Sequence, residues 1–398
     1  MTVLPGLNLE LPRSWSAATL AEVTSKIGSG ATPRGGSAVY VASGPALIRS
    51  QNVYDHEFKT EGLAFLGPDA ATALRGVTVE SGDVLINITG DSILRTAMVP
   101  DAVLPARVNQ HVAIVRSNGK VCPGFLQKWL SLPLMKDYML GHSSGGTRKA
   151  ITKGHLQSFP IPLPPIEEQR AIAATLGALD DKIESNRRAI ALIPQLVRAR
   201  VDASISQAGD RIAVAELARF VNGGAYTKGA TGTGRMVIRI AELNSGPGGS
   251  TVYNDIDVPD EKVARAGDIL MSWSGSLAVY RWFRDEAIVN QHIFKVIPTG
   301  YPAWLVFDRL DAVMPIFRGV AADKATTMGH IQRGHLESTN VEIPVGPEIE
   351  QLNEMLSPLW GRLLSAEREV VRLTELRNAL LPELLSGRMR VPTEGAAA

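Results

Sequence analysis

The chain carries an internal repeat that covers most of its length. Four short motifs occur twice in the same order, at separations of 180 to 185 residues. The copies begin at Gly82 and Gly267, Asn109 and Asn290, Gly154 and Gly334, and Glu168 and Glu350. A chain built this way folds as two copies of one unit, because each copy carries the same pattern of buried and turn residues. Two such units are expected to be related by a pseudo-twofold axis.

Length and composition fit two folded domains with connecting elements. The chain has 398 residues, of which 45% are hydrophobic and 20% charged, and one ordinary core does not grow to that size. Cys122 is the only cysteine, which excludes an internal disulfide and a thiolate metal cluster and favours a reducing compartment. Neither a basic leader nor a long apolar run is present, so the sequence predicts a cytoplasmic protein without a membrane span.

The pattern of apolar, turn-forming and proline residues along the chain predicts an α+β fold with five segments. Short apolar runs bounded by Gly, Pro, Asn and Asp predict strand-rich units over residues 1–160 and 208–345. Proline-rich stretches then introduce long helices over 161–207 and 346–390, and residues 391–398 are expected to be a disordered tail. Within the first unit, residues 125–140 predict a helix pair that Pro133 separates.

Both long helices carry a heptad pattern. Apolar residues recur at steps of three, four or seven, with Asn186 the polar exception in the first helix and Arg377 in the second. Two helices with matching seams are expected to pack as an antiparallel coiled coil that spaces the two units. Pro194 and Pro382 predict a kink or interruption near the end of each helix, because proline inside a helix costs about 3 kcal/mol.

No catalytic constellation is visible in the sequence. The glycine-rich stretches at 28–33 and 232–234 complete neither a dinucleotide fingerprint nor a phosphate loop. His330 and His335 lack the glutamate of a zinc-protease motif, and no Gly-x-Ser-x-Gly is present. The sequence therefore predicts neither an enzyme nor a metal site.

Charge limits how the chain could hold nucleic acid. The net charge is +1, and only residues 1–164 are mildly basic, with 15 Lys and Arg against 11 Asp and Glu. Two equivalent units suit a partner with two comparable sites, such as duplex DNA. Such a ligand would need local patches for reading and a protein partner for much of the phosphate neutralisation.

The repeated Asn-Gln-His motif allows two interpretations. Asn109, Gln110, Asn290 and Gln291 could each present a donor and an acceptor to an adenine edge. Alternatively, because each motif opens a strand, these side chains could satisfy turn backbone groups. Since the motif recurs in both units, shared architecture is the favoured interpretation.

Polar loops that differ between the units are better candidates for sequence readout. Small or basic residues precede the Gly-His-Leu motif of each unit at Ser144, Arg148 and Lys149 and at Lys324, Thr326 and Thr327. A second pair of loops carries Arg95 in the first unit and Ser274, Ser276, Tyr280 and Arg281 in the second. The remaining candidates are Arg34, Arg49, Gln51, Asn52, Tyr226, Lys228, Arg239 and Asn244.

The proline-flanked Glu-Glu-Gln motif carries a family resemblance. Residues 161–173, Ile-Pro-Leu-Pro-Pro-Ile-Glu-Glu-Gln-Arg-Ala-Ile-Ala, and the continuation at 179–183 resemble the specificity subunit of type I restriction-modification systems. The opening at 11–15, Leu-Pro-Arg-Ser-Trp, is similar to the start of a target-recognition domain in that family. The second copy of the motif, at 343–351, departs from the pattern, because Pro344-Val345-Gly346-Pro347 replaces Pro-Leu-Pro-Pro.

The resemblance implies a non-catalytic subunit that binds double-stranded DNA. Residues 1–160 and 208–345 would be target-recognition domains, each reading half of a split sequence, and the helices would set the spacing and dock two DNA adenine methyltransferase subunits. Those partners would hold S-adenosylmethionine, and motor-nuclease subunits would use ATP and Mg, so no cofactor is expected in this chain. The alternatives are a coiled-coil interaction scaffold without DNA recognition and, less favoured, a self-contained DNA-modifying enzyme.

Overall fold

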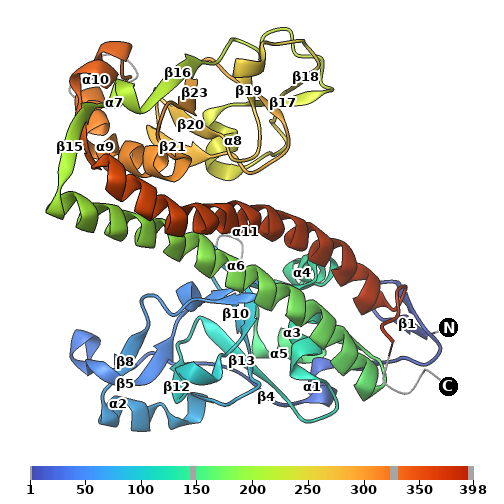
Figure 1. The fold of residues 1–398 in the computed structure, drawn as a ribbon. Helices are drawn as coiled ribbons and strands as arrows, with labels where there is room; N and C mark the ends of the chain where they lie inside the picture. Colours follow the sequence, from blue (N-terminus) through green and yellow to red (C-terminus); the bar gives the residue numbers. More distant parts are fainter. Residues whose placement is uncertain (1, 144–148, 323–329, 393–398) are drawn as a thin grey trace. The chain divides into compact units, whose positions relative to one another are not determined.

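The computed structural model describes residues 2–143, 149–322 and 330–392. The chain divides into two compact units: Met1–Glu184 together with Leu373–Ala398, and Ser185–Arg372. The long helices α6 (Ile166–Gln207) and α11 (Gly346–Ser386) each contribute one segment to each unit. Figure 1 follows the chain in sequence colours, with α6 in green and α11 in red.

Unit 1 is built on two four-stranded sheets. The first is antiparallel, in the order β11 (Thr96–Met98), β10 (Val84–Asn87), β13 (Val112–Ser117) and β4 (Thr24–Ser29). The second has the order β8 (Ala64–Leu66), β5 (Tyr40–Ile48), β12 (Ala106–Val108) and β9 (Thr78–Val79), in which β12 runs parallel to β5. Buried aliphatic side chains of the two sheets, Leu85 and Ile114 against Ile48 and Val108, form one core between them.

Helices cover the other face of the first sheet. The predicted helix pair is confirmed as α3 (Pro123–Ser131) and α4 (Pro133–Gly141), and Pro133 occupies the first turn of α4, where proline needs no hydrogen-bond partner. Phe125 and Trp129 are fully buried there with residues of both long helices. The short helix α5 (Lys153–Ser158) leads into β14 (Pro160–Leu163), which pairs with β3 (Ser16–Thr19).

Unit 2 repeats the plan of unit 1. Its first sheet has the order β16 (Ala218–Asn222), β23 (Ile293–Pro298), β20 (Ile269–Ser272) and β21 (Ala278–Arg281). Its second sheet has the order β18 (Tyr253–Asn254), β17 (Arg235–Ile238), β22 (Ala287–Val289) and β19 (Val263–Ala264), again with its one parallel pair in the middle. One helix, α9 (Ala303–Ala322), stands where unit 1 has two. The short helices α7 (Val214–Leu217) and α10 (Arg333–Ser338) and the pair of β15 (Gly209–Ala213) with β24 (Asn340–Pro344) complete it.

A glycine occupies the same tight position in both units. A Cβ atom on Gly30 would lie 1.9 Å from the carbonyl oxygen of Val108, and one on Gly223 would lie 2.1 Å from that of Asn290. The amide of Gly30 donates to Val112 and that of Gly223 to Ile293, at the start of the equivalent strands. Two backbones therefore touch here, and only glycine fits.

The two long helices are antiparallel in each unit. In unit 1, Arg377 of α11 donates to Asp180 of α6 at 2.9 Å. In unit 2, Asn186 of α6 donates to Glu369 at 2.8 Å and accepts from Arg362 at 2.7 Å. Both polar exceptions in the heptad pattern thus have partners on the opposite helix. Together with the strand-rich units, the pair confirms the predicted fold class (Figure 1).

An interruption of the helices at the prolines, one of the two predicted outcomes, is wrong, because α6 continues as α-helix through Pro194 and α11 through Pro382. Ile193 and Val197 flank the first proline and are buried, and Leu381 is buried beside the second, so packing offsets the lost hydrogen bond. At its start, α6 is shorter than predicted, because residues 160–163 form strand β14.

Candidate nucleic-acid interface

In unit 1, three segments meet beyond the end of β10. Thr89 forms an isolated antiparallel bridge with Ala150, and the amide of Ile151 donates to the carbonyl of Ile88 at 2.9 Å. The Thr89 hydroxyl lies 2.7 Å from Nδ1 of His111, the last residue of the Asn-Gln-His motif. The loop after β10, the turn before β13 and the segment before α5 are therefore held together.

A recess of about 650 Å³ opens at this junction. It brings together three predicted residues, Gln51, Arg95 and Lys149. The other residues that line it are Ser50, Tyr54, Thr89, Gly90, Asp91, Ser92, His111 and Ala150. The prediction missed Tyr54, Asp91 and His111, although His111 belonged to a repeated motif and Asp91 to a loop already singled out. We refer to this cavity as the unit 1 recess.

Tyr54 is the aromatic centre of this region. The Arg95 guanidinium lies 4.5 Å from the centroid of the Tyr54 ring, and the Lys59 ammonium lies 4.3 Å from it. Both distances are within the range of a cation–π interaction. A cation is thus placed at the recess by an aromatic ring.

The asparagines of the repeated motif have architectural contacts. In unit 1, the Asn109 side chain accepts from the amide of His111 at 3.1 Å, and its carbonyl accepts from Val112 as β13 begins. Asn290 is buried at the start of β23, where its carbonyl accepts from Ile293. These contacts match the turn interpretation of the motif. Gln110 and Gln291 are exposed, and each amide nitrogen lies 3.2 Å from the following histidine.

Two further candidates in unit 1 hold a loop in place. Asn52 is fully buried, and its amide donates to the carbonyls of Lys59 and Glu61 at 2.9 and 3.2 Å. Arg49 donates through Nη2 to the carbonyl of Gly62 at 2.5 Å. The Asn52 side chain also accepts from the amide of Arg49 at 3.0 Å, so it has no polar atom to spare for a base edge. Both side chains act on the shape of the loop that carries Gln51.

Arg239 occupies the matching place in unit 2. Its guanidinium donates to both carboxylate oxygens of Glu242, at 3.0 and 2.6 Å. Burial opposes the charge of Glu242, yet hydrogen bonds from Arg239 and Thr251 hold the pKa of that carboxyl below its usual value. The pair caps α8 (Ile240–Ser245) and is internally satisfied.

The junction of unit 2 is aromatic where that of unit 1 is cationic. Ser274 bridges His330, as Thr89 bridges Ala150. The Trp273 ring lies 5.3 Å from the His292 ring and 6.4 Å from the His330 ring, and its Nε1 donates to Asn222 at 3.0 Å. Ser274 is buried, whereas Ser276 is exposed. We refer to Asn222, Trp273, His292 and His330 as the unit 2 aromatic cluster.

Tyr280 and Arg281 face the long helices. A cavity of about 470 Å³ is lined by Asn244, Tyr280 and Arg281 together with residues of α6 and α11. The Tyr280 hydroxyl donates to Asn244 at 2.6 Å. Arg281 is 6% exposed, pairs with Glu367 at 2.6 Å and lies 4.4 Å over the Trp360 ring. Burial lowers the pKa of Arg281 and raises that of Glu367, so this pair fastens β21 to α11.

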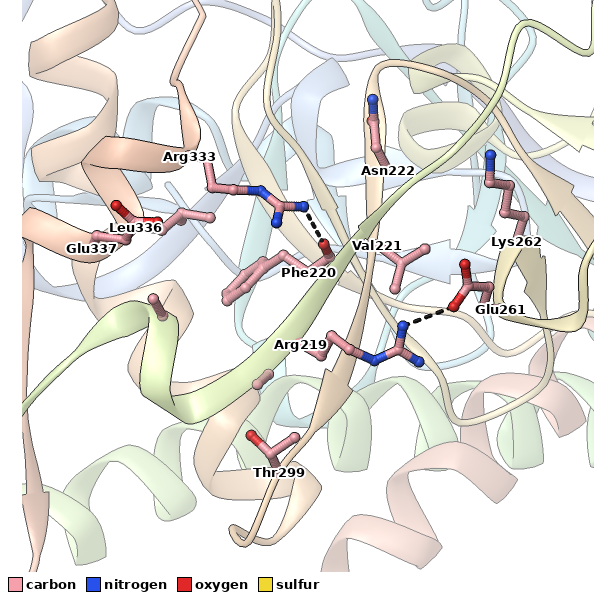
Figure 2. A pocket seen from close by; sticks show the side chains of 12 residues that line it. Arg219, Phe220, Val221, Asn222, Glu261, Lys262, Thr299, Arg333, Leu336 and Glu337 are labelled. Atoms are coloured by element: carbon pink, nitrogen blue, oxygen red, sulfur yellow. Dashed lines mark hydrogen bonds and ion pairs between the residues drawn. The ribbon is translucent and has the colours of Figure 1, made fainter.

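A second cavity in unit 2, of about 620 Å³, lies between β16, α10 and the short 3-10 helix at 260–262 (Figure 2). Figure 2 shows Arg219 directed at Glu261, at 2.7 Å, and Arg333 reaching the carbonyl of Phe220, at 3.2 Å. Lys262 adds a third cation to the lining. None of the predicted residues lines this cavity, and no motif in the sequence marked it.

The remaining candidates do not join these sites or cannot be placed. Arg34 and Lys228 are exposed on loops. Tyr226 is half-buried, and its carbonyl accepts from the Asn254 amide at 2.9 Å. Ser144, Arg148, Lys324, Thr326 and Thr327 lie outside the described residues. Within the described ranges, no group of three or more His, Cys, Asp or Glu side chains could hold a metal ion, and no helix among them is long and apolar enough to cross a membrane.

Comparison with known proteins identifies relatives of this architecture. The sequence model of the family described as "Type I restriction modification DNA specificity domain" matches residues 76–195, from β9 into α6. The type I restriction enzyme MjaIX specificity subunit of Methanocaldococcus jannaschii is 20% identical over 96% of this chain and 95% of its own length. The EcoKI specificity subunit of Escherichia coli K12 is 24% identical over 48% of this chain and 41% of its own length.

A solved structure shares the fold. The S subunit of the type I restriction-modification system of M. genitalium superposes with a TM-score of 0.66 at 13% identity, over 94% of this chain and 98% of that one. The match covers both strand-rich units and both long helices. Residues 76–195 thus match a type I restriction modification DNA specificity domain, and nearly the whole chain is similar to a type I specificity subunit.

Proposed function

We propose that the chain recognises a bipartite DNA sequence, with each unit reading one half. One observation carries the proposal: the same junction is built twice on equivalent frames and is furnished with different side chains. The Thr89–Ala150 and Ser274–His330 bridges and the two Asn-Gln-His turns are equivalent. A frame that is kept while its exposed polar residues change is what reading two different half-sites requires.

The unit 1 recess supplies the groups that contact a base edge. Arg95 and Lys149 are donors, Asp91 is an acceptor, and Gln51 offers both. The recess is concave, and its loops are fixed by backbone bonds, so a base edge could approach without reordering the loops. Mixed donors and acceptors favour the major groove, where the four base pairs present different patterns.

The unit 2 aromatic cluster supports a different preference. By strand register, Trp273 lies where unit 1 has Ile88, and His292 where it has His111, so unit 2 carries an additional aromatic ring at this junction. Apolar contact with a thymine methyl group is the readout that such rings favour. In this proposal, the cavity of Figure 2 adds phosphate contacts through Lys262 and Arg333. Because the two units carry different side chains at these places, we expect them to read different half-sites.

We further propose that the long helices dock two DNA adenine methyltransferase subunits. A specificity subunit is the non-catalytic member of its complex. Exposed apolar side chains on the helices support docking: Leu192 is 60% exposed on α6, and Met355 is exposed on α11. The partners would hold S-adenosylmethionine, and motor-nuclease subunits would use ATP and Mg, in the cytoplasm. Their positive charge would supplement a chain whose net charge is only +1.

A selection experiment tests the proposal. The full chain, assembled with its methyltransferase partner, is incubated with a randomised DNA duplex library, and bound molecules are sequenced. The expected result is two short conserved elements separated by a fixed number of unconserved base pairs, with binding that weakens as salt rises. Binding without any sequence enrichment would favour the alternative, a coiled-coil scaffold that does not read DNA.

A further inference from the structure

Arg95 is held in place from two directions. Its backbone closes a turn, since its amide donates to Ser92 at 3.2 Å and its carbonyl accepts from Asn87 at 2.9 Å. The neighbouring Leu94 is buried and adopts a φ of 67°, a conformation that a leucine keeps only where its surroundings enforce it. The side chain then lies against the Tyr54 ring, at 4.5 Å.

The donors of this guanidinium are unused by the residues that the structure describes. Among them, no carboxylate lies within ion-pair distance of Arg95, and its side chain donates no hydrogen bond. Two arginines of unit 2 differ, because Arg239 is bound to Glu242 and Arg281 to Glu367. The aromatic ring already holds this arginine in place, and its donors are unused by the described residues. Its side chain therefore has little conformational freedom left to lose on binding.

We infer that Arg95 reads a guanine in the half-site of unit 1. The inference rests on the proposed function and names one base within it. Guanine offers two adjacent acceptors in the major groove, O6 and N7, and the fork of an arginine matches both. A lysine ammonium can also donate to these acceptors, but it lacks the planar fork, so the guanidinium gives the better geometric match.

The surroundings of Arg95 favour a base edge over a phosphate. Asp91 lines the same recess, and its carboxylate repels a phosphate group. That carboxylate can instead accept from N4 of cytosine, the partner of guanine in the pair. The donors of Arg95 and the acceptor of Asp91 thus complement the acceptors of guanine and the donor of cytosine in one base pair.

Unit 2 lacks this group at the equivalent position. Thr96 pairs with Ile86 in β10 as Val279 pairs with Met271 in β20, so Ala278 stands where unit 1 has Arg95. The corresponding junction holds Trp273 instead of a free cation. The guanine preference is therefore expected in one half-site only.

The test compares Arg95→Ala with a matched control, Lys59→Ala. Both residues place a cation over Tyr54, but only Arg95 lines the recess. Each variant of the full chain, assembled with the methyltransferase partner, selects from the randomised library. For Arg95→Ala, we expect the preference for guanine at one position of one half-site to fall on the order of tenfold, with every other position unchanged. Lys59→Ala should keep all preferences.

Two further variants make the result decisive. Arg95→Lys keeps the charge but loses the planar fork, so it should weaken the guanine preference, whereas a phosphate contact would be preserved. Trp273→Ala should alter the opposite half-site, which assigns the halves to the units. Two outcomes would overturn the inference and leave the proposed function standing. One is that Arg95→Ala weakens the preference equally at all positions, and the other is that the wild-type site has no guanine in the half read by unit 1. Absence of any enriched sequence in the wild type would overturn both.

Discussion

Asp180 of α6 accepts a hydrogen bond from Arg377 of α11, and the same carboxylate pairs with Lys128 of α3. His56, from the loop between β6 (Val53–Tyr54) and β7 (Glu57–Phe58), lies 3.7 Å from it. One buried acid therefore joins both long helices to the body of unit 1. The network places a charged group where the heptad pattern alone would call for an apolar one.

We expect Asp180→Ala to destabilise unit 1 by about 3 kcal/mol, because it leaves the buried Lys128 and the partly buried Arg377 without a counter-charge. Chemical denaturation would measure the free energy of unfolding. Glu167→Ala serves as the control, since its pair with Arg170 is exposed at both ends and contributes little. If the two substitutions lowered the free energy of unfolding equally, burial of the charged network would not account for its contribution to stability.

His56 should make stability depend on pH. Burial, helped by the nearby Lys128, lowers the pKa of His56 to about 4, from an ordinary value of 6.5. The unfolded chain takes up this proton below about pH 6.5 while the folded chain does not, so stability is complete above that pH and falls as pH drops towards 4. The loss is of order 3 kcal/mol.

The matched variant for this measurement is His56→Asn. His56 has a φ of 61°, and asparagine tolerates that left-handed backbone. Unfolding free energies between pH 8 and pH 4.5 should show a shallower slope for the variant than for the wild type. An unchanged slope would mean that another group is responsible.

Gly30→Ala should unfold or severely destabilise unit 1, by at least about 3 kcal/mol. The added methyl group would meet the Val108 carbonyl at 1.9 Å, and backbone on both sides cannot move away. Gly28→Ala, two residues earlier in β4, is the control, because nothing lies within 4 Å of its Cβ position. A thermal melt of both variants measures the contrast, and similar melting temperatures would contradict the packing described here.

Two substitutions on α6 distinguish the role of a buried residue from that of an exposed one. Val197→Asp should destabilise the protein by more than about 3 kcal/mol, since Val197 is 1% exposed and no cation awaits the new charge. Leu192→Asp should leave the unfolding free energy nearly unchanged, because that side chain already faces solvent. If the helix docks a methyltransferase, Leu192→Asp weakens co-purification with that partner, and intact assembly would count against docking at this face.

Trp273→Ala should change which DNA the protein selects without preventing selection. The half-site read by unit 2 is expected to lose specificity by about 1–3 kcal/mol per affected position, while the half-site of unit 1 stays as it was. Sequencing of selected duplexes measures both halves at once. Loss of specificity in both halves would indicate that Trp273 supports the fold of unit 2 and not its reading surface.

The sequence predicted the architecture better than the roles of single residues. The repeat and the heptads follow from local patterns, so both units and both helices could be predicted. Leu179 and Leu373 fit the apolar pattern, yet they are only half-buried. Arg377 seemed to interrupt the apolar pattern, although its guanidinium is paired with Asp180, 197 residues earlier in the chain. Periodicity describes one helix and cannot report what the facing element contributes.

The candidate site was predicted only in part, for the same reason. Arg95 and Arg281 seemed equivalent as basic residues of matching loops. One is free and stacked on Tyr54, and the other is buried against Glu367 and Trp360, which are distant in sequence. Whether an arginine can bind a ligand depends on neighbours that the local sequence does not reveal.

The close approach at Gly30 and Gly223 bears on how such a protein can change its specificity. That contact joins main chain to main chain, so the identity of the side chains in the loop over residues 88–95 does not enter it. Exchanging exposed side chains of that loop, such as Asp91, leaves this main-chain contact unaltered. New DNA preferences could thus arise by substitution at the rim of either unit, one unit at a time, without any need to evolve a new framework.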